Sequence, residues 1–235
     1  MEAAGFPKIL ITFGGVAVGK TTARKAVMPL LGMDEETSWN CGADEIQESM
    51  PEFRDAFVSG DRERLRRFCE ESWSEVKRLQ HERIHDALDK KQSIFLEWCN
   101  EKQFEFLACG ESRELPAEKW EAQGYQLAVC LVKCLDIEWA IAAAKKREEA
   151  DGRHVNEEYI RLSQQNRALH FVNAAVALRD RAIAMKTSVP LFVSAIRRAA
   201  DGDAQITVLS AEKMVHCSTD DEAQALLDLL CASES

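Results

Sequence analysis

Apolar residues follow two different patterns along the chain. Short continuous runs, rich in β-branched residues, are typical of buried strands. They lie at 9–13, 92–99, 127–132, 188–196 and 205–209, with a shorter one at 38–41. Other segments repeat apolar residues every three or four positions and predict helices. These are 21–28, 51–91, 101–108, 137–149, 156–185 and 220–231.

The order of these segments predicts the fold class. Strands that alternate with helices are typical of α/β folds with a mainly parallel sheet. The last two strands are separated by Asp201-Gly202-Asp203, so we expect them to form a C-terminal hairpin. No internal repeat or long linker interrupts the pattern. We therefore expect one domain over residues 1–235, with helices on both faces of the sheet.

Two helical segments carry local signals of where they begin and break. Within 51–91, Gly60 and Asp61 predict a boundary between two helices, with Asp61 as the N-cap of the second. Asn156 is a good N-cap for the segment that reaches Met185, which we expect to be one helix. The segment 51–91 forms an all-helical insertion in the α/β pattern.

A glycine-rich stretch between the first strand and the first helix predicts a phosphate-binding loop. Residues 14–21 match the pattern G-x-x-x-x-G-K-[ST], and the strand–loop–helix context agrees with it. Backbone N–H groups of such a loop and the following helix N-terminus bind triphosphate oxygens. Ala17 stands where many such loops have glycine, and it accepts fewer backbone angles. We expect the nucleotide to contact Gly14, Gly15, Val16, Ala17, Val18, Gly19, Lys20, Thr21 and Thr22.

The chemistry of this loop indicates ATP and Mg²⁺ as cofactors. Lys20 would reach the β- and γ-phosphates, and the Thr21 hydroxyl would bind Mg²⁺. An alternative is a glycine-rich turn that binds nothing. A GTPase is less well supported, because no N-K-x-D sequence occurs.

Two carboxylates are expected near the loop, because ligands of α/β sheets bind at the carboxyl ends of the strands. Glu97 ends the strand at 92–99, and Asp44 follows the short strand at 38–41. Asp44 could deprotonate an acceptor hydroxyl, or it could cap the helix that Glu45 begins.

Arg147 and Arg153 flank a break after the helix at 137–149 and could close over the phosphates; a solvated helix end is the alternative.

Composition narrows the classes of partner. The formal net charge is −10 and the pI is near 5.1, which argues against a broad nucleic-acid or anionic-membrane surface. Without a basic stripe, Trp98, Trp120 and Trp139 are interpreted as packing residues and not as base-stacking platforms. No apolar run is long enough for a transmembrane helix, and no signal peptide is recognised. The 8 cysteines form no C-x-x-C pair, so we expect reduced thiols in a cytoplasmic protein.

A zinc-protease pattern, H-E-x-x-H, also occurs at residues 81–85. Both histidines would share a helix face, but the next predicted element is an apolar strand that offers no third ligand. Glu101 and Glu105 are the nearest candidates. A charged helix face is the alternative.

The ordered series of motifs resembles the zeta-toxin-like P-loop kinases. It comprises the loop at 14–21, Ala43-Asp44-Glu45-Ile46 with Pro51 seven residues after Asp44, Leu96-Glu97, and Gly152-Arg153-His154-Val155. The resemblance covers residues 8 to 210. The resemblance implies a P-loop kinase fold. Members of the family include toxins that phosphorylate UDP-N-acetylglucosamine. A protein inhibitor is implied if this chain is a toxin.

The resemblance also implies roles for individual residues. Asp44 matches the catalytic base, Arg153 matches an ATP-contacting arginine, and Arg147 matches its partner. Glu97 and Glu82 match glutamates that bind the substrate. The resemblance implies that the segment 51–91 lies on the substrate side and that the segment 145–170 forms a lid. The family has Gly-Thr-x-Arg after the strand-end glutamate, whereas this chain has Trp98-Cys99-Asn100-Glu101. Glu101 would repel the diphosphate of a nucleotide sugar. The resemblance therefore supports the kinase residues of this chain more strongly than it supports the family's substrate.

The sequence thus predicts an ATP-dependent kinase that phosphorylates a hydroxyl group of a small molecule or nucleotide sugar. One alternative is a nucleotide-binding regulatory module with little turnover, prompted by Ala17 and by the altered residues after Glu97. A further alternative is the H-E-x-x-H zinc hydrolase.

Overall fold

A sheet at the centre of the molecule organises the fold. The computed structural model describes residues 6–112, 115–151, 155–197 and 204–233. In these residues six strands pair in the order β2-β3-β1-β4-β5-β6. Their bounds are β1 Lys8–Phe13, β2 Trp39–Asn40, β3 Ile94–Trp98, β4 Gln126–Cys134, β5 Leu191–Arg197 and β6 Gln205–Leu209. The first five strands are parallel and β6 is antiparallel to β5, which confirms the expected mainly parallel sheet and C-terminal hairpin.

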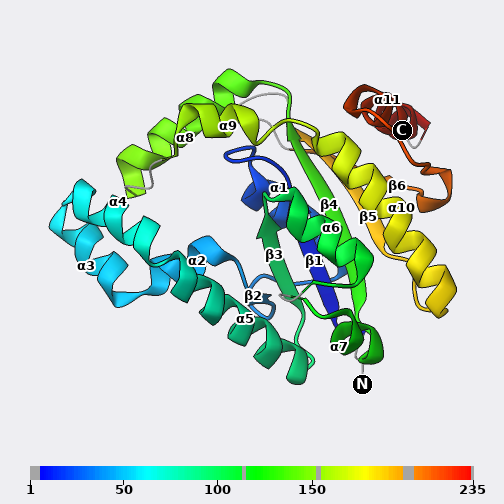
Figure 1. Cartoon of the computed structure of the whole chain (residues 1–235), viewed down its shortest axis with the longest axis horizontal. Coiled ribbons are helices and arrows are strands. Elements are labelled where there is room, and N and C mark those ends of the chain that lie inside the picture. Colours follow the sequence, from blue (N-terminus) through cyan, green and yellow to red (C-terminus); the bar gives the residue numbers. More distant parts are fainter. Residues whose placement is uncertain (1–5, 113–114, 152–154, 198–203, 234–235) are drawn as a thin grey trace.

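The helices cover both faces of this sheet (Figure 1). They are α1 Lys20–Val27, α2 Ala43–Ser49, α3 Pro51–Ser59, α4 Arg62–Glu71, α5 Trp73–Asp89, α6 Glu101–Cys109, α7 Ala117–Ala122, α8 Ile137–Asp151, α9 Glu157–Leu162, α10 Arg167–Met185 and α11 Asp220–Ser233. Two short 3₁₀ turns, η1 Pro29–Leu31 and η2 Ala211–Lys213, complete the described elements. Of these, α7 was not expected from the sequence.

Alternating side chains of the strands give the molecule two cores. Ile9, Ile11 and Phe13 point to one face of β1, where they pack with buried residues of α5, α6, α10 and α11. Leu10 points to the other face and packs with α1. The result is the three-layer arrangement expected of an α/β P-loop fold.

The helical insertion has one more break than the sequence indicated. Asp61 caps α4 as expected, since its carboxylate accepts a hydrogen bond from the Arg64 backbone N–H at 2.9 Å. A second break at Ser72 then divides the predicted second helix into α4 and α5. The Ser72 hydroxyl accepts a hydrogen bond from the buried Gln47 side chain, which ties this corner to α2.

The prediction of one helix from Asn156 to Met185 is wrong. Asn156 does cap a helix, accepting from the Glu158 N–H at 2.7 Å, but that helix (α9) ends at Leu162. Asn166 adopts a left-handed backbone with φ of 54°, and α10 begins after it. Asparagine is among the few side chains that accept this conformation readily, so the break has a local cause.

The arrangement of the helices leaves the carboxyl edge of the sheet open between two groups of elements. In Figure 1, α3, α4 and α5 extend to one side, and α8 and α9 lie above the strand ends. The loop between β1 and α1 emerges between these two groups. The expected insertion and lid segments therefore flank the phosphate-binding motif.

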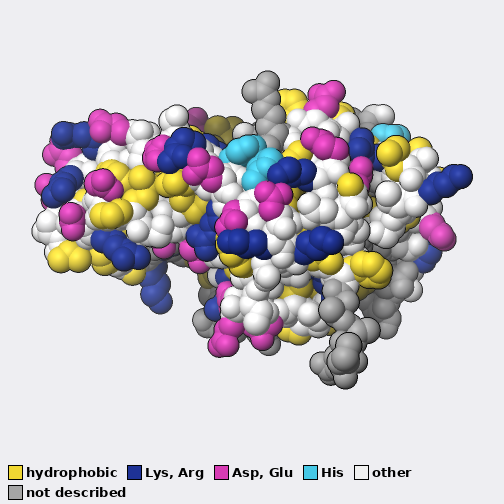
Figure 2. Space-filling model, turned by 90° about the horizontal axis from the view of Figure 1, so that it is seen from below, with side chains coloured by type: hydrophobic (Ala, Val, Ile, Leu, Met, Phe, Trp, Pro, Cys, Tyr) yellow, Lys and Arg dark blue, Asp and Glu magenta, His cyan; other side chains and the backbone are white. Residues whose placement is uncertain are grey.

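Charged side chains of both signs occur on the face of the molecule shown in Figure 2. On the face seen in Figure 2, acidic and basic groups are interspersed and do not separate into stripes. Within the described part of the chain, no helix is long and apolar enough to cross a membrane.

Candidate active site

The loop from Gly14 to Lys20 has backbone angles and contacts that only small residues allow. Gly19 has φ of 88°, and a Cβ there would lie 2.5 Å from Nη1 of Arg197. A Cβ on Gly14 would lie 2.5 Å from the Val132 carbonyl oxygen. Both positions of the G-x-x-x-x-G-K-[ST] pattern thus require glycine for steric reasons.

Ala17 is the unusual residue of this loop. It has φ of 60°, a left-handed conformation that costs an alanine roughly 1–2 kcal/mol. This backbone angle agrees with the prediction that alanine suits this position less well than glycine. Local strain of this kind persists where neighbouring contacts hold the backbone in place.

The connection between α9 and α10 supplies such contacts. The Val16 N–H donates to the Ser163 hydroxyl at 2.9 Å, and the Gln164 side chain donates to the Val16 carbonyl at 3.2 Å. Lys20 Nζ donates to the Gly15 carbonyl at 2.8 Å. Segments far apart in the sequence therefore fix the loop, and the ammonium group of Lys20 lies over it.

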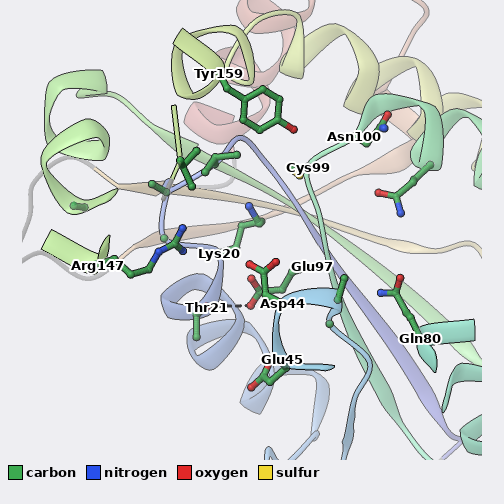
Figure 3. A pocket seen from close by; sticks show the side chains of 18 of the residues that line it. Lys20, Thr21, Asp44, Glu45, Gln80, Glu97, Cys99, Asn100, Arg147 and Tyr159 are labelled. Atoms are coloured by element: carbon green, nitrogen blue, oxygen red, sulfur yellow. Dashed lines mark hydrogen bonds between the residues drawn. The ribbon is translucent and has the colours of Figure 1, made fainter. Parts of the chain in front are cut away.

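A cavity of about 790 Å³ opens beside the loop at the carboxyl edge of the sheet. Figure 3 shows Lys20, Thr21, Asp44 and Glu97 pointing into its centre. Residues from the loop, α1, α2, α5, β3, α6, α8, α9 and β5 line it. The structure thus brings together most of the residues that the sequence selected.

Glu97 is bound directly to the first turn of α1. Its Oε1 accepts hydrogen bonds from the Thr21 hydroxyl at 3.1 Å and from Arg24 Nη1 at 3.0 Å. Arg24 is 3% exposed, and its guanidinium stacks 4.2 Å from the Phe95 ring centroid and pairs with Glu35. A hydroxyl and a carboxylate at this position are the hard oxygen donors that Mg²⁺ prefers, so the residues present fit that cation.

Asp44 lies in the first turn of α2 and lines the cavity. The N-cap of α2 is Gly42, with no side-chain capping bond. The alternative prediction, that Asp44 caps this helix, is therefore wrong, because Gly42 occupies the N-cap position. Its carboxylate faces the same space as Lys20 and Glu97 (Figure 3).

The two arginines that the sequence selected have different outcomes. Arg147 extends from α8 into the cavity on the side of the phosphate-binding loop (Figure 3). Arg153 lies outside the described residues. The neighbouring Glu148 lies 3.8 Å from Arg66 of α4, so this end of α8 contacts the helical insertion.

Glu82 does not reach the cavity. Its carboxylate is exposed and pairs with Arg78 one turn earlier on α5, beside a shallow depression formed with Trp39, Arg83 and Asp86. The cavity is lined instead by residues of another face of this helix, Trp73, Lys77 and Gln80. Gln80 and Glu82 differ by two positions, about 200° around a helix, which explains the difference.

The sequence analysis missed several lining residues, among them Arg197 and Tyr159. Arg197 ends β5 and is 8% exposed; its Nη1 donates to the Thr22 hydroxyl at 3.4 Å. Its guanidinium stacks 4.7 Å from the Trp139 ring centroid. Trp139, which the sequence predicted to be a packing residue, therefore packs on Arg197, and it also lines the cavity. Tyr159 of α9 also lines the cavity (Figure 3). The strand-end rule that selected Glu97 could also have selected Arg197.

The two histidines of H-E-x-x-H lie together on α5, with ring centroids 4.1 Å apart. Among the described residues, no group of three or more His, Cys, Asp or Glu side chains is arranged to hold a metal ion. Burial, followed by the nearby charge of His81, lowers the pKa of His85. The motif therefore lacks the third ligand of a zinc protease in the described part of the chain.

Glu101, where the family resemblance implies arginine, has an arginine beside it. Arg167 of α10 is 6% exposed and its Nη1 lies 3.6 Å from Glu101 Oε2. The same guanidinium stacks over Phe13 and donates through Nε to the Ser163 carbonyl. Burial lowers the pKa of Arg167, and the carboxylate of Glu101 opposes that shift. This cation is therefore engaged within the protein.

Comparison with solved structures places this fold among known ones. The AvrRxo1-ORF1:AvrRxo1-ORF2 complex with sulphate ions matches at 12% identity and a TM-score of 0.56, covering 97% of this chain and 64% of that one. The complex with ATP matches at 12% identity and a TM-score of 0.55, over 97% and 64%. This chain thus spans less than two thirds of those chains. The PezAT toxin–antitoxin system of Streptococcus pneumoniae matches at 12% identity and a TM-score of 0.46, over 97% and 85%.

Sequence comparison identifies the family. No curated protein matches significantly. A model of the zeta toxin family, however, matches residues 2–195, which include the phosphate-binding loop, Asp44, Glu97 and Arg147. Because this match extends over most of the chain and the fold agrees with it, the chain belongs to the zeta toxin family.

Proposed function

We propose that this protein is an ATP-dependent phosphotransferase that transfers the γ-phosphoryl group to an alcohol hydroxyl. The observation that carries the proposal is the meeting of the phosphate-binding loop, the Thr21–Glu97 pair and Asp44 in one cavity. Such a set matches the parts that phosphoryl transfer needs: a phosphate cradle, a metal site and a base. Membership of a family of P-loop kinase fold supports it.

The donor nucleotide would occupy the loop side of the cavity. Lys20 would move from the Gly15 carbonyl to the β- and γ-phosphates, a shift that a flexible ammonium group makes readily. Arg147 and Arg197 line the same side and would neutralise phosphate charge. Thr21 and Glu97 would hold Mg²⁺, and the ion would supply positive charge that offsets the negative charge developing on the phosphate oxygens.

Asp44 would act on the acceptor. In the proposed step its carboxylate takes the hydroxyl proton while the acceptor oxygen forms a bond to the γ-phosphorus. The bond between that phosphorus and the β,γ-bridging oxygen breaks, and ADP leaves. Most of the rate would come from positioning and from fixed charges around the phosphoryl group.

Replacement of Asp44 tests the assignment of the base. Asp44→Asn should lower kcat by about 10²–10⁴-fold, because the amide cannot accept the proton, while the Kd for ATP changes little. Calorimetry gives the Kd, and ADP release with a metabolite extract as the acceptor source gives the rate. Glu52→Gln on α3, an exposed carboxylate outside the cavity, is the control.

The same assays separate the proposal from its main rival. A nucleotide-binding regulatory module would bind ATP but show no ADP release stimulated by the extract. That outcome with the unmodified protein would remove the kinase proposal. Full activity in Asp44→Asn would remove only the assignment of the base.

Control by a protein inhibitor is a prediction that follows from the family description, which names toxins. A kinase that harms its own cell needs a partner that blocks the donor or acceptor site until it is released. Purification of the chain from its native cells, followed by mass spectrometry of bound proteins, tests this.

A further inference from the structure

The cavity has two chemically different sides, and this difference bears on the acceptor. Asp44 and Glu97 lie at its centre, Lys20 and Arg147 on one side, and Gln80 and Asn100 on the other (Figure 3). If the proposed function holds, ATP occupies the cationic side. The acceptor must then lie against the other side, here called the acceptor wall: Trp73, Lys77, Gln80, Cys99, Asn100, Gln103 and Tyr159.

The acceptor wall is built mainly from neutral hydrogen-bonding groups. It contains three carboxamides and a phenol, and Trp73 presents an aromatic surface that is 46% exposed. Gln80 is 1% exposed, and its amide is held in place because it donates to the Cys41 carbonyl at 2.7 Å. Gln80 therefore shapes the wall, whereas the more exposed Asn100 and Gln103 carry amide groups that can both donate to and accept from a hydroxyl group.

Positive charge on the acceptor wall is limited. Among the described residues of the wall, Lys77 is the single cation, and its Nζ donates to Gln80 Oε1 at 3.0 Å and lies 5.4 Å from the Trp73 ring centroid. Arg167, which pairs with Glu101, is buried against that carboxylate and is not among the residues that line the cavity. A diphosphate needs several cations or oriented donors around it. Here it would instead meet the carboxylates of Asp44 and Glu45, because Glu97 is bound by Thr21 and Arg24.

We propose that the acceptor is an uncharged compound that carries vicinal hydroxyls and no phosphate group, such as a free sugar, a cyclitol or a nucleoside. Its ring packs against Trp73, because the C–H groups of such a ring carry partial positive charge and the indole face is negative. The amides of the wall bind its hydroxyls. One hydroxyl loses its proton to Asp44 as its oxygen bonds to the γ-phosphorus, and ADP departs. This inference rests on the proposed kinase function and specifies its substrate.

Fractionation of a metabolite extract tests the charge of the acceptor. Anion exchange at neutral pH separates the extract into an unbound neutral fraction and a bound fraction that contains nucleotide sugars and sugar phosphates. Each fraction is mixed with the wild-type protein, γ-labelled ATP and Mg²⁺, and transfer of label is measured. We expect the label in products of the neutral fraction, and we expect periodate, which cleaves vicinal diols, to remove that activity.

Every outcome of this experiment decides something. Label transferred only in the bound fraction would overturn the inference and leave the kinase intact. Activity in the neutral fraction that survives periodate would also overturn it, because the acceptor would then lack vicinal hydroxyls. No transfer in either fraction, with ATP binding shown by calorimetry, would overturn the kinase proposal itself.

Variants of Trp73 test the wall independently of the extract's composition. With the neutral fraction, Trp73→Ala should lower acceptor kcat/KM by about tenfold with the KM for ATP unchanged, whereas Trp73→Phe should retain most activity. Phe57→Ala, another exposed aromatic of the helical insertion outside the cavity, should match the wild type. Equal loss in Trp73→Ala and Phe57→Ala would indicate a general structural effect and contradict the role of Trp73.

Discussion

Arg24 sets the position of the carboxylate that faces the proposed metal site. Its guanidinium lies between Glu97 and Glu35, stacks on Phe95 and is almost completely buried. Glu97 uses the same oxygen for Arg24 and Thr21, so the arginine fixes how that oxygen meets α1. A single buried residue therefore connects the stability of the first α/β unit to the chemistry of the site.

Replacement of Arg24 should affect both properties. Arg24→Met should lower the free energy of unfolding by about 2 kcal/mol, because it leaves a partly buried carboxylate without its cation. It should also raise the Mg²⁺ concentration needed for half-maximal activity. Urea denaturation and a Mg²⁺ titration measure the two effects. Glu35→Gln, which changes the more exposed arm of the pair, should cost less than about 1 kcal/mol and leave the Mg²⁺ dependence unchanged.

Arg197 offers a second prediction at the same scale. Because it contacts Gly19 and Thr22 beside the loop, Arg197→Ala should raise the KM for ATP by about tenfold or more while the KM for the acceptor changes little. Arg197→Lys should recover part of the affinity, since the charge remains but the planar stacking on Trp139 is lost. Steady-state kinetics with each substrate varied decides this. A change confined to the KM for the acceptor would contradict the placement of Arg197 on the nucleotide side of the cavity.

At the scale of elements, the break between α9 and α10 holds the loop between β1 and α1 in place. The residues of this break include Ser163 and Gln164, which hold Val16 by hydrogen bonds. A continuous helix from Asn156 to Met185 could not present both side chains to the loop in this way. The lid role of 145–170 stays a prediction, but its α9–α10 connection contacts the loop at Val16 directly.

Asn166 provides a test of that break. Asn166→Ala should destabilise the protein by about 1 kcal/mol, because alanine pays more than asparagine for a left-handed backbone, while Asn166→Gly should be almost neutral. Thermal and urea denaturation of the pair give the comparison. If the segment were one helix in solution, alanine would instead be the more stable replacement, because it has the higher helix propensity.

At the scale of the whole molecule, the cavity connects the sheet edge, the helical insertion and the α8–α9 segment. A ligand that contacts all three stabilises the folded state, because it does not bind the unfolded chain. At about 100 times its Kd, ATP with Mg²⁺ should add roughly 2.7 kcal/mol to the free energy of unfolding. For a chain of this size that corresponds to a rise in Tm of about 5–10 °C.

Differential scanning fluorimetry measures this shift. Lys20→Ala should lose most of it, because the β- and γ-phosphates then lack their cation. EDTA should reduce it in the wild type through the loss of the metal. An equal shift in Lys20→Ala would mean that ATP binds elsewhere.

The sequence by itself determined the features that depend on neighbouring residues. Local backbone preferences and the topology of parallel sheets set several features. They are the strand–loop–helix at 8–27, the strand end with Glu97, the helix start with Asp44, and the caps at Asp61 and Asn156. Only the tertiary structure decided which side of each helix faces the cavity. A helix turns about 100° per residue, so Gln80 lines the cavity and Glu82 does not. The same long-range packing brought Glu97 to Arg24, and it brought Arg197 and Ser163 to the loop. No local pattern encodes the meeting of residues so far apart in the chain.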